Sequence, residues 1–389
     1  MSFKLSAVSA AVILAFSVGS VFAADTSTVN QPGSGNTASV TQEYNSPSVT
    51  TSSSVTQVGD GNTATVTQSR SSGNSTSSVI EYSGANSNQS TVYQNITSGV
   101  SADIQNSGSR NTGRISQQNV ISATGAIAQS GNDNTGIIDQ SYGNGQTATI
   151  NGAGGAGNYA SSTQTGDNQG AQIAQGSGSN NAVAASQQGN GNRSQLGQYG
   201  SNSTLTTSQN GGGLALNNVV FTQNGNHDSG YATQTGSALN AGVTQSGDYN
   251  QAVLSQNGSN SSLNITQGGY NGRANATQSG DNQSAALNQS GSNNVAGFSQ
   301  TGNGNSINAS QTGDQNYASL TQNNLNNVAS LTQSGQLNQS TLNQDGVSNN
   351  ASLTQGGYNN MASVSQNGTS FTSNSSQTGN SNRLYVVQR

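Results

Sequence analysis

The chain of 389 residues has no cysteine and no tryptophan, and only 5% of its residues are charged. Without cysteine, no disulfide can hold the molecule together. With 29% hydrophobic and 5% aromatic residues, it is too polar for a conventional globular core. Asn, Gln, Ser, Thr and Gly make up most of the rest. The composition indicates either a polar low-complexity chain or a repeat fold whose interior accepts amides.

The few charged residues exclude several function classes. The chain has 8 basic and 13 acidic residues and a net charge of −5, which does not suggest nucleic acid as a partner. His227 is the single histidine, so a histidine-based triad and a three-histidine metal site are both excluded. The acidic residues are scattered along the chain and fall mostly in expected turns, without the clustered carboxylates of a polysaccharide-cleaving enzyme. We therefore expect no enzymatic activity, no metal and no cofactor.

Residues 1–23 have the features of a secretory signal peptide. Lys4 is followed by an apolar run, and the segment ends Ser20-Val21-Phe22-Ala23 with small residues at the expected cleavage site. No later stretch is apolar enough to span a membrane. We expect a secreted chain that begins at Ala24.

Glutamine recurs every eleven residues through the second part of the chain. The unbroken series is Gln223, Gln234, Gln245, Gln256, Gln267, Gln278, Gln289, Gln300, Gln311, Gln322, Gln333, Gln344, Gln355, Gln366, Gln377 and Gln388. Counting each Gln as position 1, position 3 is nearly always Gly, position 6 mostly Asn, position 8 mostly Ala and position 10 apolar. The period is present with interruptions earlier, for example from Gln94 to Gln105 and from Gln118 to Gln129. We divide the chain into the signal peptide at 1–23, irregular repeats at 24–222 and regular repeats at 223–389.

Each unit reads as one strand and one turn. Positions 6, 8, 10 and the next Gln differ by two, so in an extended chain these side chains share one face. The expected inward asparagines are Asn294, Asn305, Asn316, Asn327, Asn338, Asn349 and Asn360. The turn needs a residue with positive φ, which the position-3 glycines supply: Gly291, Gly302, Gly313, Gly335, Gly346 and Gly357.

The sequence thus predicts an all-β solenoid of the cross-β, β-arch type. Asp248, Asp281 and Asp314 share one turn position and lie 33 residues apart. A three-strand coil would stack these carboxylates about 4.8 Å apart, which is repulsive, so two strands per 22-residue coil are favoured. Stacking would place Gln over Gln and Asn over Asn, and we expect each buried amide to donate to the copy in the next coil.

The repeat resembles that of the curlin family, whose pattern is Ser-x5-Gln-x-Gly-x-x-Asn-x-Ala-x3-Gln. The segments Gln289–Gln300 and Gln311–Gln322 reproduce it from the first Gln onward. The resemblance implies a curli subunit that forms extracellular amyloid fibres, or fimbriae, of a biofilm matrix with a role in adhesion. It also implies a Gram-negative-type bacterium, self-assembly, a nucleator or partner curlin subunit and an outer-membrane secretion pore.

Two departures limit the comparison with the family. The chain has roughly three times the usual number of repeats and lacks a Gly-rich leader. Its ending is similar to that of the minor, nucleating subunit, so the major and minor roles both stay open. We expect the terminal edge strand to present Leu384, Val386 and Gln388 to a second copy.

The alternative is an ice- or surface-binding solenoid with a flat face of Ser and Thr. Ser319 and Thr321, Ser330 and Thr332, and Ser352 and Thr354 would lie on such a face. A monomeric binder should have segments that cap its end strands, and neither end shows one.

Overall fold

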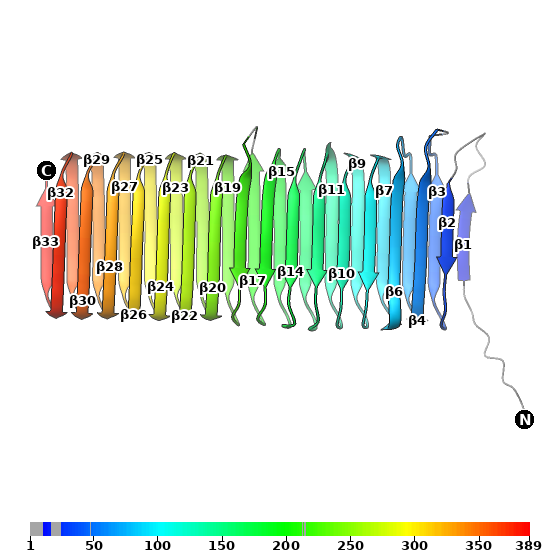
Figure 1. The fold of residues 1–389 in the computed structure, drawn as a ribbon, viewed down its shortest axis with the longest axis horizontal. Helices are drawn as coiled ribbons and strands as arrows, with labels where there is room; N and C mark the ends of the chain where they lie inside the picture. Colours follow the sequence, from blue (N-terminus) through cyan, green and yellow to red (C-terminus); the bar gives the residue numbers. More distant parts are fainter. Residues whose placement is uncertain (1–10, 17–24, 47, 212, 214) are drawn as a thin grey trace, which may run out of the picture. The chain divides into compact units, whose positions relative to one another are not determined.

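The computed structural model describes residues 11–16, 25–46, 48–211, 213 and 215–389, which divide into two compact units, 1–191 and 192–389. The described residues contain strands and turns and no helix, so no helix among them could cross a membrane. Strand follows strand along the chain in both units (Figure 1). This confirms the predicted all-β class.

The strands of the first unit are β1 (Ala11–Phe16), β2 (Thr26–Asn30), β3 (Thr37–Glu43), β4 (Thr51–Asp60), β5 (Thr63–Ser69), β6 (Ser75–Asn86), β7 (Gln89–Ser98), β8 (Ser101–Asn106), β9 (Thr112–Ile121), β10 (Thr124–Gln129), β11 (Thr135–Asn144), β12 (Thr147–Gly152), β13 (Tyr159–Thr165), β14 (Gly170–Gln175) and β15 (Ala182–Gly189). Most of the predicted signal peptide lies outside the described residues. Its central part is β1, which pairs in parallel with β3.

The strands of the second unit are β16 (Asn192–Gln198), β17 (Thr204–Gly211), β18 (Asn217–Gln223), β19 (Ser229–Ser237), β20 (Asn240–Asp248), β21 (Gln251–Ser259), β22 (Ser262–Tyr270), β23 (Arg273–Asp281), β24 (Ser284–Ser292), β25 (Val295–Asn303), β26 (Ser306–Asp314), β27 (Tyr317–Leu325), β28 (Val328–Gln336), β29 (Gln339–Val347), β30 (Asn350–Tyr358), β31 (Met361–Thr369), β32 (Thr372–Asn380) and β33 (Arg383–Gln388).

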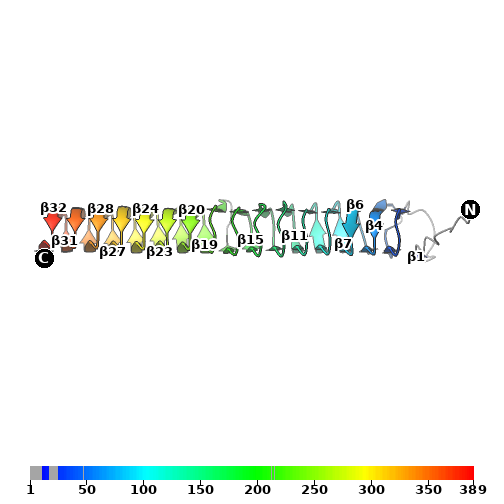
Figure 2. The same ribbon diagram turned by 90° about the horizontal axis from the view of Figure 1, so that it is seen from below.

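Within each unit the chain alternates between two parallel sheets. Odd-numbered strands pair with odd-numbered strands, as β27 does with β29, and even-numbered strands with even-numbered ones, as β28 does with β30. The two sheets form facing layers, which Figure 2 shows edge on. One coil is therefore one strand in each sheet, which confirms the predicted β-solenoid with two strands per coil.

Coil length differs along the chain. Stacked glutamines of the first unit are 23 to 26 residues apart. In the second unit the first spacing is 25 residues, from Gln198 to Gln223, and every later spacing in that sheet is 22. The extra residues of the longer coils are accommodated without loss of stacking.

Asp248, Asp281 and Asp314 lie at the ends of β20, β23 and β26. Asp281 is thus in the other sheet from the other two. Tyr270 and Ser292 separate Asp248 from Asp314 within their sheet. The two-strand coil keeps these carboxylates apart, as the charge argument predicts.

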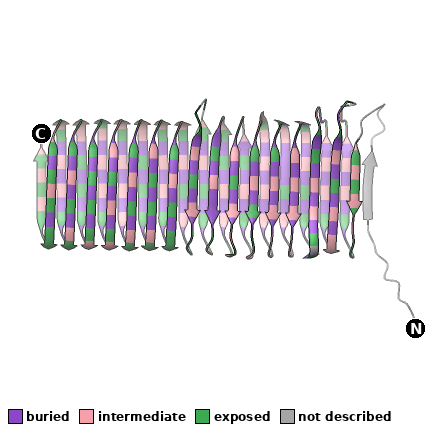
Figure 3. Cartoon of the chain, viewed as in Figure 1, coloured by how far each residue is buried: buried purple, intermediate pink, exposed green. Residues whose placement is uncertain are grey.

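Burial alternates along every regular strand, because successive side chains point to opposite faces (Figure 3). In β28, Ala329, Leu331 and Gln333 are buried and the residues between them are exposed. Each fully buried Leu, Ile or Val contributes roughly 1.5 to 3 kcal/mol.

The interior between the sheets is narrow, and large residues on one sheet are matched by small ones on the other. A Cβ atom on Gly230 of β19 would lie 2.3 Å from the ring of Phe221 on β18, so only glycine leaves room for that ring. Gly113, Gly125 and Gly136 make the same room for Ile104, Ile115 and Ile127. Packing in the core therefore requires that a large side chain on one sheet faces a small residue on the other, in addition to the alternation of buried and exposed positions.

Candidate functional site

The eleven-residue glutamine series separates into two hydrogen-bonded rows, one in each sheet. Along each row of the second unit, the side-chain Nε2 of one Gln donates to the Oε1 of the Gln in the next coil at 2.7 to 2.9 Å. Nearly all these amides are fully buried. The arrangement gives each interior amide a partner on both sides.

The second N–H of these amides also has an acceptor. The Nε2 of Gln311 donates to the carbonyl oxygen of Val295, and that of Gln333 to the carbonyl oxygen of Tyr317, sixteen residues earlier in each case. A Gln therefore links its own row to the backbone of the opposite sheet. An inward Gln left unpaired would cost about 1 to 3 kcal/mol.

The seven predicted asparagines are all buried and stacked, but their hydrogen bonds differ from those expected. The Oδ1 of Asn294 accepts from the backbone N–H of Asn316, and Asn316 Nδ2 donates to the carbonyl oxygens of Thr312 and Gly335. Direct amide pairs are the exception, as between Asn327 and Asn305 at 3.2 Å. The asparagines mainly satisfy turn backbone, because their shorter side chain reaches the adjacent carbonyls.

The six predicted turn glycines have φ angles between 99° and 127°. A second constraint was not expected from sequence. A Cβ atom on Gly313 would lie 2.1 Å from the carbonyl oxygen of Gly335 in the next coil, and the other turns stack in the same way. Glycine is needed here for close stacking as well as for φ.

In the irregular part, two glutamines of the eleven-residue series are not in the rows. Gln117 is the buried residue that bonds Gln94 and Gln140, whereas Gln118 is half-buried and bonds Ser116. Gln105 lies on the outer face, and Asn106 takes the inward position on β8. The exact eleven-residue spacing therefore selected the wrong residues here, because these coils have 23 residues and not 22.

Two buried acidic residues occupy amide positions and were not found from sequence. Glu81 takes the place of a row Gln and accepts from Gln57 Nε2 at 3.3 Å and from Ser90 Oγ at 2.9 Å. Burial raises the pKa of Glu81 to about 7. Asp228 takes the place of a position-6 Asn, and burial raises its pKa to about 6. The signal that could have identified them is their position, because each acidic residue stands where the repeat usually has Gln or Asn.

Within the described residues, β32 and β33, the last strands of the two sheets in the second unit, pair on one side only. On β33, Leu384, Val386 and Gln388 face inward but are half-exposed, since the described chain has no further coil beyond them. Gln388 accepts from Gln366 at 2.8 Å. The predicted edge residues thus lie at an open end of the stack. Their role in assembly stays a prediction.

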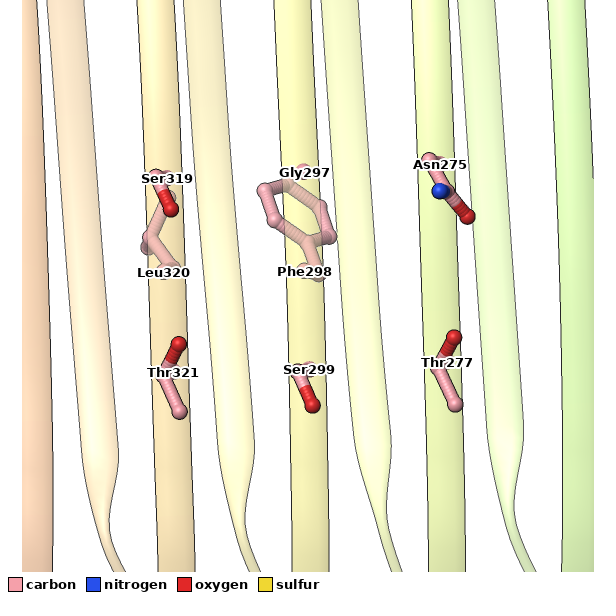
Figure 4. Close-up of a pocket in the computed structure, with 8 residues that line it drawn as sticks. All are labelled: Asn275, Thr277, Gly297, Phe298, Ser299, Ser319, Leu320 and Thr321. Atoms are coloured by element: carbon pink, nitrogen blue, oxygen red, sulfur yellow. The ribbon is translucent and has the colours of Figure 1, made fainter.

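The described residues contain no group of three or more His, Cys, Asp or Glu that could hold a metal ion. His227 lies in an exposed turn and stacks on Tyr249 with ring centroids 4.6 Å apart. A shallow hollow opens on the outer face of β23, β25 and β27, where Gly297 has no side chain between Asn275 and Ser319 (Figure 4). It contains no charged side chain.

The Ser and Thr pairs considered for a binding face do not share one sheet. Ser319 and Thr321 are on β27, whereas Ser330, Thr332, Ser352 and Thr354 are on β28 and β30. Thr332 and Thr354 belong to the same column on the outer face of the even-numbered sheet as Thr222, Thr244 and Thr266. Asn288 and Ser310 lie between these two sets, so the column is polar but not uniform.

The family model for the curlin associated repeat matches residues 240–269 and 280–313, within the regular coils of the second unit. No curated protein matches the chain.

Proposed function

We propose that this chain, whose regular coils match the curlin associated repeat, is a structural subunit of an extracellular curli-type amyloid fibre. The observation that carries the proposal is the pair of in-register amide rows on parallel strands, which a second copy can extend without a change of geometry. Curlin-repeat proteins are fibre-forming structural subunits. The buried rows and the open end strands support the same role here.

The finer parts of the proposal rest on the family and on residues 1–23. We propose export through an outer-membrane pore of a Gram-negative-type bacterium, contact with a nucleator or partner curlin subunit, and a place in the biofilm matrix and in adhesion. Fibre growth requires no reaction and no cofactor, since strand pairing alone joins the subunits.

The test is assembly of purified residues 24–389. We expect dye-binding fibres whose diffraction has a spacing of about 4.7 Å along the fibre and about 10 Å across it. Expression in a host that has a curli export system should place the fibres at the cell surface. A chain that stays monomeric and folded under these conditions contradicts the proposal.

The second candidate is a surface-binding solenoid, which the threonine column of β18, β20 and β22 favours. A regular row of hydroxyl groups could match a crystalline surface such as ice. Thermal hysteresis by the stable monomer, lost when Thr222, Thr244 and Thr266 are changed to Val, would support this function. Fibre formation without thermal hysteresis would reject it.

A further inference from the structure

Three aromatic side chains occur in successive coils of the second unit, at the carboxyl ends of β18, β20 and β22. They are His227, Tyr249 and Tyr270. The backbone N–H of Tyr249 donates to the carbonyl oxygen of Asn226 at 2.9 Å, and Tyr270 is the register partner of Asp248. The three rings therefore lie one after another along the turns of the even-numbered sheet.

The backbone explains how these rings are oriented. His227 and Tyr249 have φ angles of 60° and 62° at equivalent turn positions, and their rings stack with 3° between the planes. Tyr270 comes one residue earlier in its turn, because the left-handed residue of that turn is Asn271, with φ 53°. The Tyr270 ring therefore meets that of Tyr249 at 62°, with a centroid distance of 5.4 Å, an edge-to-face arrangement that aromatic pairs favour.

Two features favour a reaction between these two tyrosines. Both are about half exposed, Tyr249 at 47% and Tyr270 at 50%, so an oxidant in solution can reach their hydroxyl groups. The hydrogen-bonded turns also hold the two rings together, whereas tyrosines on separate molecules must first collide. His227, from the preceding coil, covers a face of the Tyr249 ring, which leaves Tyr270 as its tyrosine neighbour.

Other exposed tyrosines lack such a neighbour. Tyr231, Tyr317 and Tyr358 are 45% to 48% exposed, and none of them makes a ring contact with another aromatic residue in the described part of the chain. Exposure alone is therefore common among the tyrosines, and the contact between Tyr249 and Tyr270 distinguishes this pair.

We propose that Tyr249 and Tyr270 are an oxidative cross-linking site, where a peroxidase with hydrogen peroxide joins them as dityrosine. Each phenol gives up one electron and its hydroxyl proton, and the two radicals form a carbon–carbon bond between ring carbons next to the hydroxyl groups. The hydrogens on these two carbons leave as protons while the phenolic oxygens take up protons. The pair loses two hydrogen atoms in total, and one hydrogen peroxide is reduced to two waters. The link ties β20 to β22 within one chain and does not depend on fibre assembly.

The experiment oxidises the folded chain of residues 24–389 with a haem peroxidase and hydrogen peroxide at low protein concentration. Dityrosine fluorescence measures the yield. Trypsin cleaves after arginine, so both tyrosines lie in the peptide of residues 194–273, whose mass should fall by two hydrogens. The oxidised chain should also unfold at a higher denaturant concentration, because the link constrains the unfolded state.

Phenylalanine variants remove one hydroxyl group and keep the ring. Tyr249→Phe and Tyr270→Phe should each lower the dityrosine yield about fivefold or more, because the remaining tyrosine has no partner in the adjacent coil. Tyr358→Phe is the matched control, since Tyr358 ends β30 as Tyr270 ends β22 and is similarly exposed. It should leave the yield unchanged. Circular dichroism checks that each variant keeps its β structure.

A gain of cross-linking tests the geometry directly. Leu337 has φ 58° and stands one coil before Tyr358. Tyr249 has the same place relative to Tyr270. In a chain that carries Tyr270→Phe, the further change Leu337→Tyr should restore the dityrosine, and the loss of two hydrogens should move to the tryptic peptide of residues 274–383.

Equal dityrosine yields from Tyr270→Phe and Tyr358→Phe would overturn the site. An unchanged mass of the peptide 194–273, or cross-linked dimers as the main product, would also overturn it. A folded Leu337→Tyr variant that forms no dityrosine would show that contact between adjacent turns is not enough, which contradicts the proposal. These outcomes leave the proposed fibre function intact, because they concern a link within one chain.

Discussion

At the scale of single residues, a carboxyl group stands where the repeat calls for an amide. Glu81 accepts from both Gln57 and Ser90 and has no N–H to pass along the row. Asn106 donates to Ser90, which in turn donates to Glu81, so no hydrogen bond passes from Glu81 to the next coil of the row. The two donors favour the ionised carboxylate, whereas burial disfavours its negative charge.

The pKa of Glu81 in the folded chain is raised to about 7 from an ordinary value of 4.5, so the folded state binds the proton more tightly. Its stabilising contribution is complete below about pH 4.5 and is lost as the pH rises to 7. We expect the first unit to lose about 3 kcal/mol of stability across this window.

Denaturant titrations at pH 5 and pH 8, with hydrogen exchange of β6 and β8 as a local probe, measure this loss. Glu81→Gln should remove most of the pH dependence of these strands. Glu43→Gln, at a half-exposed outward position, is the control. Equal pH dependence in both variants would contradict a role for the buried carboxyl.

Left-handed turn residues offer a second test at this scale. Leu337 has φ 58° at the position where Asn359 has φ 55° in the next coil of its sheet. A bulky residue in this region is strained, whereas Asn tolerates it. Leu337→Asn should therefore stabilise the chain by roughly 0.5 to 1 kcal/mol, and Asn359→Leu should destabilise it by a similar amount, measured by chemical unfolding. A stabilising Asn359→Leu would mean that side-chain packing outweighs backbone strain.

At the scale of the strand and turn, substitutions on the same strands can test the inward glutamine row and the outward-facing residues separately. Gln311, Gln333 and Gln355 are consecutive members of one row on β26, β28 and β30. Ser310, Thr332 and Thr354 precede them and face outward.

Changing the three glutamines to Leu should lengthen the lag of fibre formation several-fold, because neighbouring amides and carbonyls lose partners worth about 1 to 3 kcal/mol each. Changing the three outward residues to Ala should leave the lag nearly unchanged. The kinetics of dye binding measure both. Equal lags would show that the inward row does not govern assembly.

The turn glycines allow a similar comparison between two stacked turns of the even-numbered sheet. Gly313→Val should be far more damaging than Gln336→Ala, since a side chain at Gly313 meets the carbonyl oxygen of Gly335 at 2.1 Å and must also adopt φ 99°. We expect a loss of more than about 3 kcal/mol for the first and under about 0.5 kcal/mol for the second. Unfolding curves of the two variants decide the order, and a reversed order would contradict the turn assignment.

At the scale of the whole chain, the proposed assembly requires the two sheets to stay in phase across a junction. A chain that ends after β32 presents an even-numbered strand to the next copy's even-numbered β2, so an odd-numbered strand is missing at the junction. A chain that ends after β31 restores the alternation, with Gln355 and Gln366 as the last glutamines of the two rows.

We therefore expect deletion of residues 382–389 to slow seeded growth about tenfold or more, and the larger deletion of residues 371–389 to restore it largely. Seeded elongation rates of the two truncated chains measure this. Growth that declines steadily with the number of residues removed would contradict the phase requirement.

The eleven-residue period was enough to predict strands, turns, the inward Gln and the two-strand coil. Alternation of side chains in a strand is local, and the repulsion expected among Asp248, Asp281 and Asp314 favoured a two-strand coil over a three-strand coil. The open edge residues Leu384, Val386 and Gln388 followed from the same alternation.

The partners of the buried groups were decided only by the tertiary structure. Whether Gln117 or Gln118 enters a row depends on coil length, which the neighbouring strand sets through its register. The asparagine side chains donate to backbone carbonyls because stacking of the coils places those carbonyls within hydrogen-bond distance. The second hydrogen bond of a row Gln goes to a carbonyl on the opposite sheet, sixteen residues away in sequence. Such contacts between sheets have no local sequence pattern, so they could not be predicted from the repeat.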